Sequence, residues 1–415
     1  MKVLIIGSGG REHAISWKIK QKQDIELFAL PGNGGICEIG ECIEENYEDI
    51  EKVIKVAEEK KIDFTVVGPE NPLAYGIVDL FKKKNMKIFG PEKKGATLES
   101  SKCYAKEFMK KYSVPTADFQ IAESYEEAKR IIEKRTSPYV IKYDALAAGK
   151  GVRVIDSFEE GLKYLKEIFI DNIFKGENIK VVIENCLAGK ELSYLIFTDT
   201  STYIPMVPAK DYKRVFDGDK GLNTGGMGCY SPPHFFNEEI EERIKKEIVE
   251  PTIDGLRKEN IVYRGVLYFG LMLTDSGIYV LEYNVRFGDP ETQVILPRME
   301  TDLIEVMEGV SEGQLNKIDI KWSDEKCVCV ILASGGYPGK YEKGKEIKYL
   351  DRVEDVIIFH AGTKKEGDKF YTNGGRVLGI TGLASTTDEA REKVYKAVNV
   401  IDFEGKHYRK DIAIC

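Results

Sequence analysis

The stretch Val280-Leu-Glu-Tyr-Asn-Val-Arg-Phe-Gly-Asp-Pro-Glu291 joins an apolar strand to a dense group of polar residues. Because side chains alternate along a strand, Glu282 and Asn284 are expected on one face. The other face is expected to carry Leu281, Tyr283 and Val285. A carboxylate and an amide oxygen at this spacing suit a hard cation such as Mg²⁺, and Arg286 adds a fork for a carboxylate or phosphate. A solvated strand end is the alternative, but the clustering favours a site.

The composition of the whole chain limits the class of protein to which this stretch can belong. The 415 residues include 61 Lys plus Arg and 69 Asp plus Glu, a net charge of -8, and 42% are hydrophobic. This is typical of a globular enzyme of roughly two to four domains. The sequence contains no basic stripe, so nucleic-acid binding is not expected. No apolar run approaches the ~18 residues of a membrane span, and the short apolar run Val3–Ile6 is no signal peptide.

The eight cysteines are scattered, and only Cys327 and Cys329 lie close together. On a strand these two share a face, where buried apolar side chains are expected. The four histidines are far apart in the sequence, so no zinc site is expected. We expect a reduced, cytoplasmic protein.

The first hundred residues alternate short apolar strands with amphipathic helices, which predicts an open parallel sheet with ligands at the strand ends. The expected strands are 3–6, 27–30, 64–67 and 87–89, and the expected helices are 12–20, 49–60 and 73–83.

The glycine turn Gly7-Ser-Gly-Gly10 follows the first expected strand. Glu12 stands where a dinucleotide motif needs its third glycine, and no acidic residue ends the second strand. A phosphate cradle formed by the turn and Arg11 is the favoured interpretation, and a tight turn without ligand is the alternative. Glu70, after the third strand, faces the same edge and could bond a sugar hydroxyl.

The central part of the chain is predicted to bind a nucleotide. Ser100 or Ser101 can cap a helix to about Tyr112, with Lys102 in its first turn. Strands at 138–142 and 152–155 enclose a small-residue loop with Lys150, which could fold over a triphosphate or be a solvated hairpin tip. Lys142 lies among apolar residues and needs an anionic partner.

The later part of the chain holds further loops and strands. A strand at 179–183 leads to Glu184, and residues 217–228 form a long glycine-rich connection of the kind that is usually functional. Strands at 327–333, 356–360 and 377–381 with a helix at 388–398 predict a small α+β module.

Together these residues resemble the phosphoribosylamine–glycine ligase (glycinamide ribonucleotide synthetase) family of ATP-grasp enzymes over nearly the whole chain. The motifs that carry the resemblance are Ile6-Gly-Ser-Gly-Gly-Arg-Glu-His13, Val67-Gly-Pro-Glu70, Ser101-Lys102, Leu146-Ala-Ala-Gly-Lys-Gly-Val152, Asp211-Tyr-Lys-Arg214, Asn223-Thr-Gly-Gly-Met-Gly228, Asn284-Val-Arg-Phe-Gly-Asp-Pro-Glu-Thr292, Gly335-Gly-Tyr-Pro-Gly339, His360-Ala-Gly-Thr363 and Thr372-Asn-Gly-Gly-Arg376. Each is weak alone, but their order is specific.

The resemblance implies a mixed α/β and α+β multidomain protein. Residues 1–101 would form an N-terminal α/β domain that binds phosphoribosylamine. Residues 102–320 would form an ATP-grasp domain of two α+β subdomains, with a small lid subdomain at about 117–187. Residues 321–415 would form a C-terminal α+β domain. Glycine and 5-phosphoribosylamine would be the substrates of a cytoplasmic monomer that uses ATP and Mg²⁺ or Mn²⁺.

The resemblance also implies roles for individual residues. ATP would contact Lys102, Lys142, Lys150, Glu184, Asn185, Leu187 and Glu191. Phosphoribosylamine would contact Gly9, Gly10, Arg11 and Glu70, and glycine would contact Asp211, Arg286 and Asp289. Glu282 and Asn284 would hold the metal, and the catalytic residues would be Arg286, Lys142 and Asp211. Lys210 departs from the family pattern and places a charge beside the expected glycine site.

Three other functions are open to such a sequence. Another ATP-grasp carboxylate–amine ligase is the nearest. A non-catalytic nucleotide-binding protein would have no reason to combine Glu282, Asn284 and Arg286. A dehydrogenase is disfavoured by Glu12.

Overall fold

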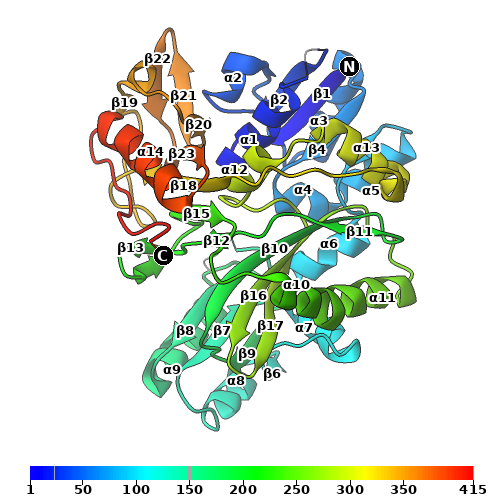
Figure 1. Ribbon diagram of the computed structural model, residues 1–415. Helices are drawn as coiled ribbons and strands as arrows, with labels where there is room; N and C mark the ends of the chain where they lie inside the picture. Colours follow the sequence, from blue (N-terminus) through cyan, green and yellow to red (C-terminus); the bar gives the residue numbers. More distant parts are fainter. Residues whose placement is uncertain (23, 148–150, 415) are drawn as a thin grey trace.

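The computed structural model describes residues 1–22, 24–147 and 151–414, and its first part is the predicted parallel sheet (Figure 1). The strand order is β3-β2-β1-β4-β5, with every neighbouring pair parallel. The strands are β1 (Lys2–Gly7), β2 (Glu26–Pro31), β3 (Glu41–Cys42), β4 (Phe64–Val67) and β5 (Ile88–Phe89). The four predicted strands are confirmed, whereas β3 spans only 2 residues and leaves no apolar run in the sequence.

Helices connect these strands, and one expectation about them is wrong. They are α1 (Gly10–Ile19), α2 (Ile36–Ile39), α3 (Ile50–Lys60), α4 (Glu70–Tyr75), α5 (Ile77–Lys83) and α6 (Lys93–Ser100). The single helix expected at 73–83 is two helices, because Gly76 has a φ of 89° and interrupts the helical hydrogen bonding. Glycine adopts this left-handed backbone without a steric penalty, so it ends one helix and begins the next.

The central region contains two antiparallel sheets. One has the order β6-β9-β7-β8 and the other has the order β11-β10-β16-β17. Their strands are β6 (Phe119–Ala122), β7 (Tyr139–Tyr143), β8 (Val152–Ile155), β9 (Val181–Asn185), β10 (Lys190–Thr198), β11 (Tyr203–Pro205), β16 (Gly265–Thr274) and β17 (Gly277–Asn284). The helix α7 (Lys102–Lys111) precedes them, and the Ser101 hydroxyl caps it by accepting from the Tyr104 N–H at 3.1 Å, as predicted.

The two central sheets belong to different hydrophobic cores. The β10–β17 sheet shares one core with the N-terminal sheet, so that Tyr194 and Phe269 pack in the same cluster as Leu4. A helical segment also packs in that cluster. It consists of α10 (Glu238–Ile244), a π-helical turn (Lys245–Val249) and α11 (Glu250–Lys258). In contrast, the sheet β6–β9 packs with α8 (Tyr125–Ile132) and α9 (Phe158–Phe169) around a separate core. A separate core is what a subdomain needs to move as a unit.

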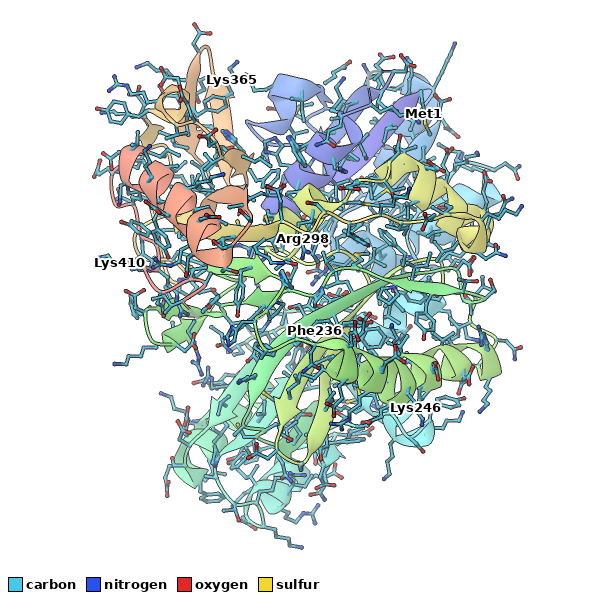
Figure 2. All side chains as sticks on the ribbon, in the orientation of Figure 1. Met1, Phe236, Lys246, Arg298, Lys365 and Lys410 are labelled. Carbon is cyan, nitrogen blue, oxygen red and sulfur yellow. A yellow bond between two sulfur atoms is a disulfide. The ribbon has the colours of Figure 1, made fainter. Side chains whose placement is uncertain are left out.

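The C-terminal part forms a five-stranded sheet of order β12-β15-β18-β23-β20. Its strands are β12 (Lys210–Asp211), β15 (Gly228–Ser231), β18 (Lys326–Ala333), β20 (Ile357–His360) and β23 (Arg376–Ala384), and α14 (Thr387–Val400) packs on it. The first two strands come from the central region, so this sheet joins two parts of the chain. Arg298, labelled in Figure 2, lies at that junction and donates to the Ser231 hydroxyl at 2.7 Å. The proposed boundaries at residues 101 and 320 stay a prediction.

Smaller elements complete the structure. They are the sheet of β19 (Glu346–Ile347), β22 (Lys369–Thr372) and β21 (Thr363–Glu366), the hairpin of β13 (Arg214–Phe216) and β14 (Lys220–Asn223), the helices α12 (Thr292–Ile295) and α13 (Leu303–Glu312), and the 3-10 turns Leu296–Arg298, Leu315–Lys317 and Leu350–Arg352. The C-terminal tail holds the hairpin, because Lys410 donates its N–H to Asp217 at 2.7 Å and Arg409 pairs with Asp219 at 2.7 Å (Figure 2).

The cysteines follow the sequence prediction only in part. Cys327 and Cys329 are buried on β18, as expected. Cys37 and Cys42 form a disulfide, so the expectation of a fully reduced chain is wrong for this pair. The two lie 5 residues apart in the sequence, Cys37 in α2 and Cys42 in β3, and their Cα atoms are 5.3 Å apart. No helix among the described residues is long and apolar enough to cross a membrane.

Two histidines that are far apart in the sequence meet between the N-terminal and C-terminal sheets. His13 on α1 accepts the His360 N–H through Nδ1 at 2.8 Å. Burial lowers the pKa of His13 to about 3 and the pKa of His360 to about 4. The folded chain therefore keeps both rings neutral at pH values where an unfolded chain protonates them.

We expect this pair to destabilise the protein as the pH falls below about 6.5, by ~1.4 kcal/mol per pH unit for each histidine. The sign follows because the unfolded state binds more protons throughout this window. Urea unfolding of His13→Asn, which keeps an acceptor, is expected to show a smaller loss between about pH 7 and about pH 5 than the native chain. The same substitution at the exposed His234 is the control, and an unchanged slope in His13→Asn would contradict the assignment.

Candidate active site

The end of β17 presents Glu282 and Asn284 away from the core, while Tyr283 and Val285 are buried in it. The expectation that Leu281 shares a face with Tyr283 and Val285 is wrong, because the pairing with β16 shifts register beside it and leaves Leu281 outside the apolar cluster that holds the other two. The backbone of Leu281 at this bulge contacts another sheet. The Leu281 carbonyl accepts from Lys142 Nζ at 2.9 Å and so connects β17 to the β6–β9 sheet.

Glu282 lies in a cationic environment. Burial acts to raise the pKa of its carboxyl group, but the surrounding cations hold it below the usual value. These cations are Lys213, Lys142, Lys102 and Arg286. Among the described residues, no side chain or N–H forms a direct hydrogen bond or ion pair with this carboxylate. An ionised carboxylate without a direct partner is suited to hold a cation.

Arg286 connects two glutamates to this strand end. Its guanidinium pairs with Glu70 Oε2 at 3.2 Å and with Glu99 Oε1 at 2.8 Å, and it donates to Asn284 Oδ1 at 3.0 Å. Arg286 lowers the pKa of Glu70 to about 2 against the effect of burial. Burial raises the pKa of Glu99 to about 7, although Arg286 acts in the opposite direction. Glu70, predicted for phosphoribosylamine, thus meets Arg286, predicted for glycine.

The expected nucleotide residues gather around a buried carboxylate. Glu184 pairs with Lys142 at 2.6 Å and with Lys106 at 2.5 Å, and all three side chains are almost fully buried. Lys106 was not predicted, because a lysine inside α7 has the pattern of a surface residue. Lys102 Nζ donates to the Ala145 carbonyl at 2.8 Å.

The remaining expected ATP residues follow Glu184 along the chain. Asn185 is exposed and its Oδ1 accepts from Arg135, while Leu187 is half-buried in the connection to β10. Glu191 is the second residue of β10, and burial raises the pKa of its carboxyl. Lys150 lies outside the described residues.

Replacement of Glu184 by glutamine is expected to destabilise the protein by about 3–5 kcal/mol, because two buried ammonium groups lose their counter-charge. ATP affinity is expected to fall as well, since both lysines lose the group that orients them. The free energy of unfolding in urea and an ATP titration would measure the two effects. The control is Glu123→Gln, which removes the exposed partner of Lys180 and is expected to cost less than about 1 kcal/mol. Equal losses in both variants would contradict the assignment.

A second charged group surrounds Lys213. Its ammonium pairs with Asp211 Oδ2 at 2.8 Å, and Glu191 and Glu291 lie close enough to favour its charged form. Glu291 accepts from the Tyr268 hydroxyl at 2.8 Å, and burial raises the pKa of its carboxyl. The acids outnumber this one lysine, so a cationic ligand such as an ammonium group fits here. Lys210 is directed onto the ring of Tyr212, 5.0 Å from its centroid.

The glycine turn of the N-terminal sheet reaches the same place. Gly9 donates its N–H to Glu12 Oε2 at 2.6 Å, and Arg11 pairs with Glu12 Oε1 at 2.7 Å. Arg11 also donates to the Phe287 carbonyl at 3.0 Å, which brings the turn against the loop after β17. A Cβ on Gly10 would lie 2.5 Å from Gln293 Nε2, so a side chain there would displace the Gln293 amide. Glu12 therefore fills part of the space that a dinucleotide motif leaves open.

Asp289 lies in that loop with both carboxylate oxygens engaged. Oδ1 accepts from Gln293 Nε2 at 2.7 Å, and Oδ2 pairs with Arg376 at 2.9 Å. Most of the described residues of the predicted set thus meet around the end of β17, whereas the exposed Asn185 contacts Arg135 instead. Six residues of the site received no role from the sequence: Glu12, Glu99, Lys106, Lys213, Glu291 and Arg376. Glu12, Lys213, Glu291 and Arg376 stand in the motifs that carry the resemblance, whereas Glu99 and Lys106 stand in none of them.

Comparison with known proteins agrees with this arrangement. Models of the phosphoribosylglycinamide synthetase N domain, ATP-grasp (A) domain and C domain match residues 1–99, 100–292 and 327–414. A phosphoribosylamine–glycine ligase of Caldanaerobacter subterraneus subsp. tengcongensis is 47% identical over 415 residues, 100% of this chain and 99% of that protein. The one from Clostridium acetobutylicum is 46% identical over 413 residues, 99% of each.

Solved structures give the same result. The phosphoribosylamine–glycine ligase of Thermotoga maritima superposes with a TM-score of 0.88 at 40% identity, covering 100% of both chains. A biotin carboxylase from Campylobacter jejuni has a TM-score of 0.76 at 18% identity, covering 98% of this chain and 92% of that one, and supports the fold alone. The predicted fold class, an N-terminal parallel sheet with an ATP-grasp region, is confirmed. The chain belongs to the phosphoribosylglycinamide synthetase family.

Proposed function

We propose that this protein joins glycine to 5-phosphoribosylamine at the expense of ATP, in de novo purine biosynthesis. The products are glycinamide ribonucleotide, ADP and phosphate, and the intermediate is glycyl phosphate. The observation that supports this most is the ionised Glu282 carboxylate, which lies within a group of cations without a direct partner among the described residues. Such a site suits a reaction in which a carboxylate approaches an anionic triphosphate.

The nucleotide is assigned to the space between the two central sheets. Lys102, Lys142 and Lys150 would neutralise its phosphates, and the connection after Glu184 would hold its adenine. Glu191 would bond its ribose. The Glu184 carboxylate supports this assignment, because it holds Lys142 beside the carbonyl of Leu281 at the end of β17.

The two other substrates are assigned on either side of Arg286. Glycine would lie near Asp211 and Arg286, with Asp289 beside it, and phosphoribosylamine would lie at Gly9–Arg11 and Glu70. The ion pair between Glu70 and Arg286 supports this, since it joins the two predicted subsites. Alignment of the reacting groups can supply up to about 7–11 kcal/mol of the barrier reduction, and no nucleophilic side chain is needed.

Glu282 and Asn284 are assigned to Mg²⁺ or Mn²⁺, which would neutralise charge on the triphosphate when bound. The donors fit a hard cation, because both offer oxygen and Glu282 is ionised. Asn284 Oδ1 accepts from Arg286 at 3.0 Å and, as a carbonyl-type oxygen, keeps a second lone pair. A cytoplasmic location and a monomeric state are part of the same proposal.

The test is to measure ADP and glycinamide ribonucleotide with ATP, Mg²⁺ and glycine, forming phosphoribosylamine in situ from ribose 5-phosphate and ammonia. We expect both products, with ADP release dependent on glycine and on phosphoribosylamine. Omission of the metal is expected to stop the reaction, and Mn²⁺ is expected to restore it. ADP release that requires a different acid or amine would overturn the proposal in favour of another ATP-grasp ligase.

A further inference from the structure

Arg376 reaches out of the C-terminal sheet to two loops of the central region. It opens β23, and its Nη1 donates to the carbonyl of Asp289 at 2.8 Å and to the carbonyl of Gly225. Its Nη2 pairs with the Asp289 carboxylate at 2.9 Å. One guanidinium thus connects the loop that follows Glu282 with the glycine-rich segment 224–228.

The glycine-rich segment is shaped to receive this guanidinium. A Cβ on Gly225 would lie 2.9 Å from Arg376 Cζ, and Gly226 has a φ of +112° with Pro290 against it. The N–H of Gly225 donates to the Tyr337 hydroxyl at 2.9 Å. The C-terminal part of the chain therefore bonds both the N–H and the carbonyl of Gly225. These two contacts fix the position of the segment from outside the central region.

The position of segment 224–228 in turn sets the charged group around Lys213. Thr224 donates its N–H and its hydroxyl to the Lys213 carbonyl, each at 2.8 Å. The N–H of Met227 donates to the Tyr212 carbonyl at 2.8 Å, and Asp211 pairs in register with Cys229. A chain of direct contacts therefore leads from Arg376 through Gly225 and Thr224 to Lys213.

We propose that Arg376 is a positioning residue that holds segment 224–228 against Asp289 and keeps water away from the acyl phosphate. This inference rests on the proposed function. Attack of the amine on the acyl carbon forms the C–N bond and releases phosphate, whereas attack of water on the same carbon returns glycine and phosphate. Both routes consume ATP, but only the first yields the amide. Arg376 favours the first by closing the site.

The experiment measures ADP and glycinamide ribonucleotide in the same reaction for the native chain, Arg376→Gln and Arg376→Lys. The native chain is expected to give about one ADP per amide, and Arg376→Gln about threefold more or higher, because the open site admits water. Arg376→Lys keeps the charge but loses the fork, so its ratio is expected to lie between the two. Arg352→Gln, at an exposed arginine of the same part of the chain, is the matched control and is expected to stay at the native ratio.

A ratio of about one ADP per amide in Arg376→Gln, at whatever rate, would overturn the inference, since a merely structural role lowers the rate without uncoupling. Amide hydrogen exchange over residues 222–230, without substrates, tests the same contact independently of the reaction. Exchange is expected to quicken there in Arg376→Gln, and an unchanged rate would overturn the inference. If Arg376→Gln does not fold, Tyr337→Phe removes only the contact with the Gly225 N–H, and the same two measurements decide. A native chain that forms no amide would instead refute the proposed function, and the exchange result would still decide the contact.

Discussion

Replacement of Glu282 by alanine is expected to reduce the rate of ligation by about a thousandfold or more while the fold stays intact. Glu282 is ionised because the cations around it outweigh its burial, and no described residue bonds to it directly. Its removal would leave those cations without the carboxylate that lies among them, and would leave Asn284 alone to hold the metal. Steady-state turnover at saturating ATP and glycine measures the loss.

Two variants separate this role from a general effect on the hairpin of β16 and β17. Glu282→Gln keeps the shape of the side chain but not its charge, so it is expected to be nearly as impaired as alanine. Asp275→Ala changes an exposed carboxylate at the opposite end of the same hairpin and is expected to be near native. Thermal unfolding of all three would show whether the fold persists. Near-normal turnover in Glu282→Ala would remove Glu282 from the metal site.

Local patterns in the sequence predicted much of the fold. Strands such as β1 and β4 are continuous apolar runs between helical patterns, and Ser101 is a typical cap before α7. The pairing of β15 with β18 could not be predicted in this way, because the two strands are about a hundred residues apart and nothing local to either marks the partner. The break at Gly76 also escaped, since a single glycine within an amphipathic pattern is compatible with one continuous helix.

The residues of the candidate site were also predicted only in part. Glu282 and Asn284 were found because both stand on one strand, where alternation relates their side chains. Glu99 and Lys106 were missed, since each lies on a helix where a charged side chain is ordinary and its burial depends on distant elements. Glu99 bonds the N–H of Val285 at 2.7 Å, a contact that exists only after the helix α6 packs on β17. Charges that are buried by tertiary packing leave little trace in a local pattern.

Replacement of Arg286 by alanine is expected to raise the KM for glycine by about a hundredfold, and to change the KM for ATP only a few-fold. The guanidinium lies between Glu70, Glu99 and Asn284, on the side of the strand end where glycine is assigned. Its loss removes the partner expected for the substrate carboxylate. It also removes the cation that pairs directly with Glu70 and Glu99, so that their mutual repulsion, then opposed by Arg11 without a direct ion pair, adds to the effect.

Arg286→Lys separates charge from geometry, because lysine keeps the positive charge but cannot pair with both glutamates through a planar fork. We expect a KM for glycine between those of the native protein and the alanine variant. Glu99→Gln removes the carboxylate with the raised pKa and leaves Arg286 in place, so it controls for the loss of the buried pair alone. If the two KM values rise equally in Arg286→Ala, Arg286 serves the nucleotide. If Glu99→Gln reproduces the full effect on glycine, the effect comes from the disrupted ion pairs rather than from contact with the substrate.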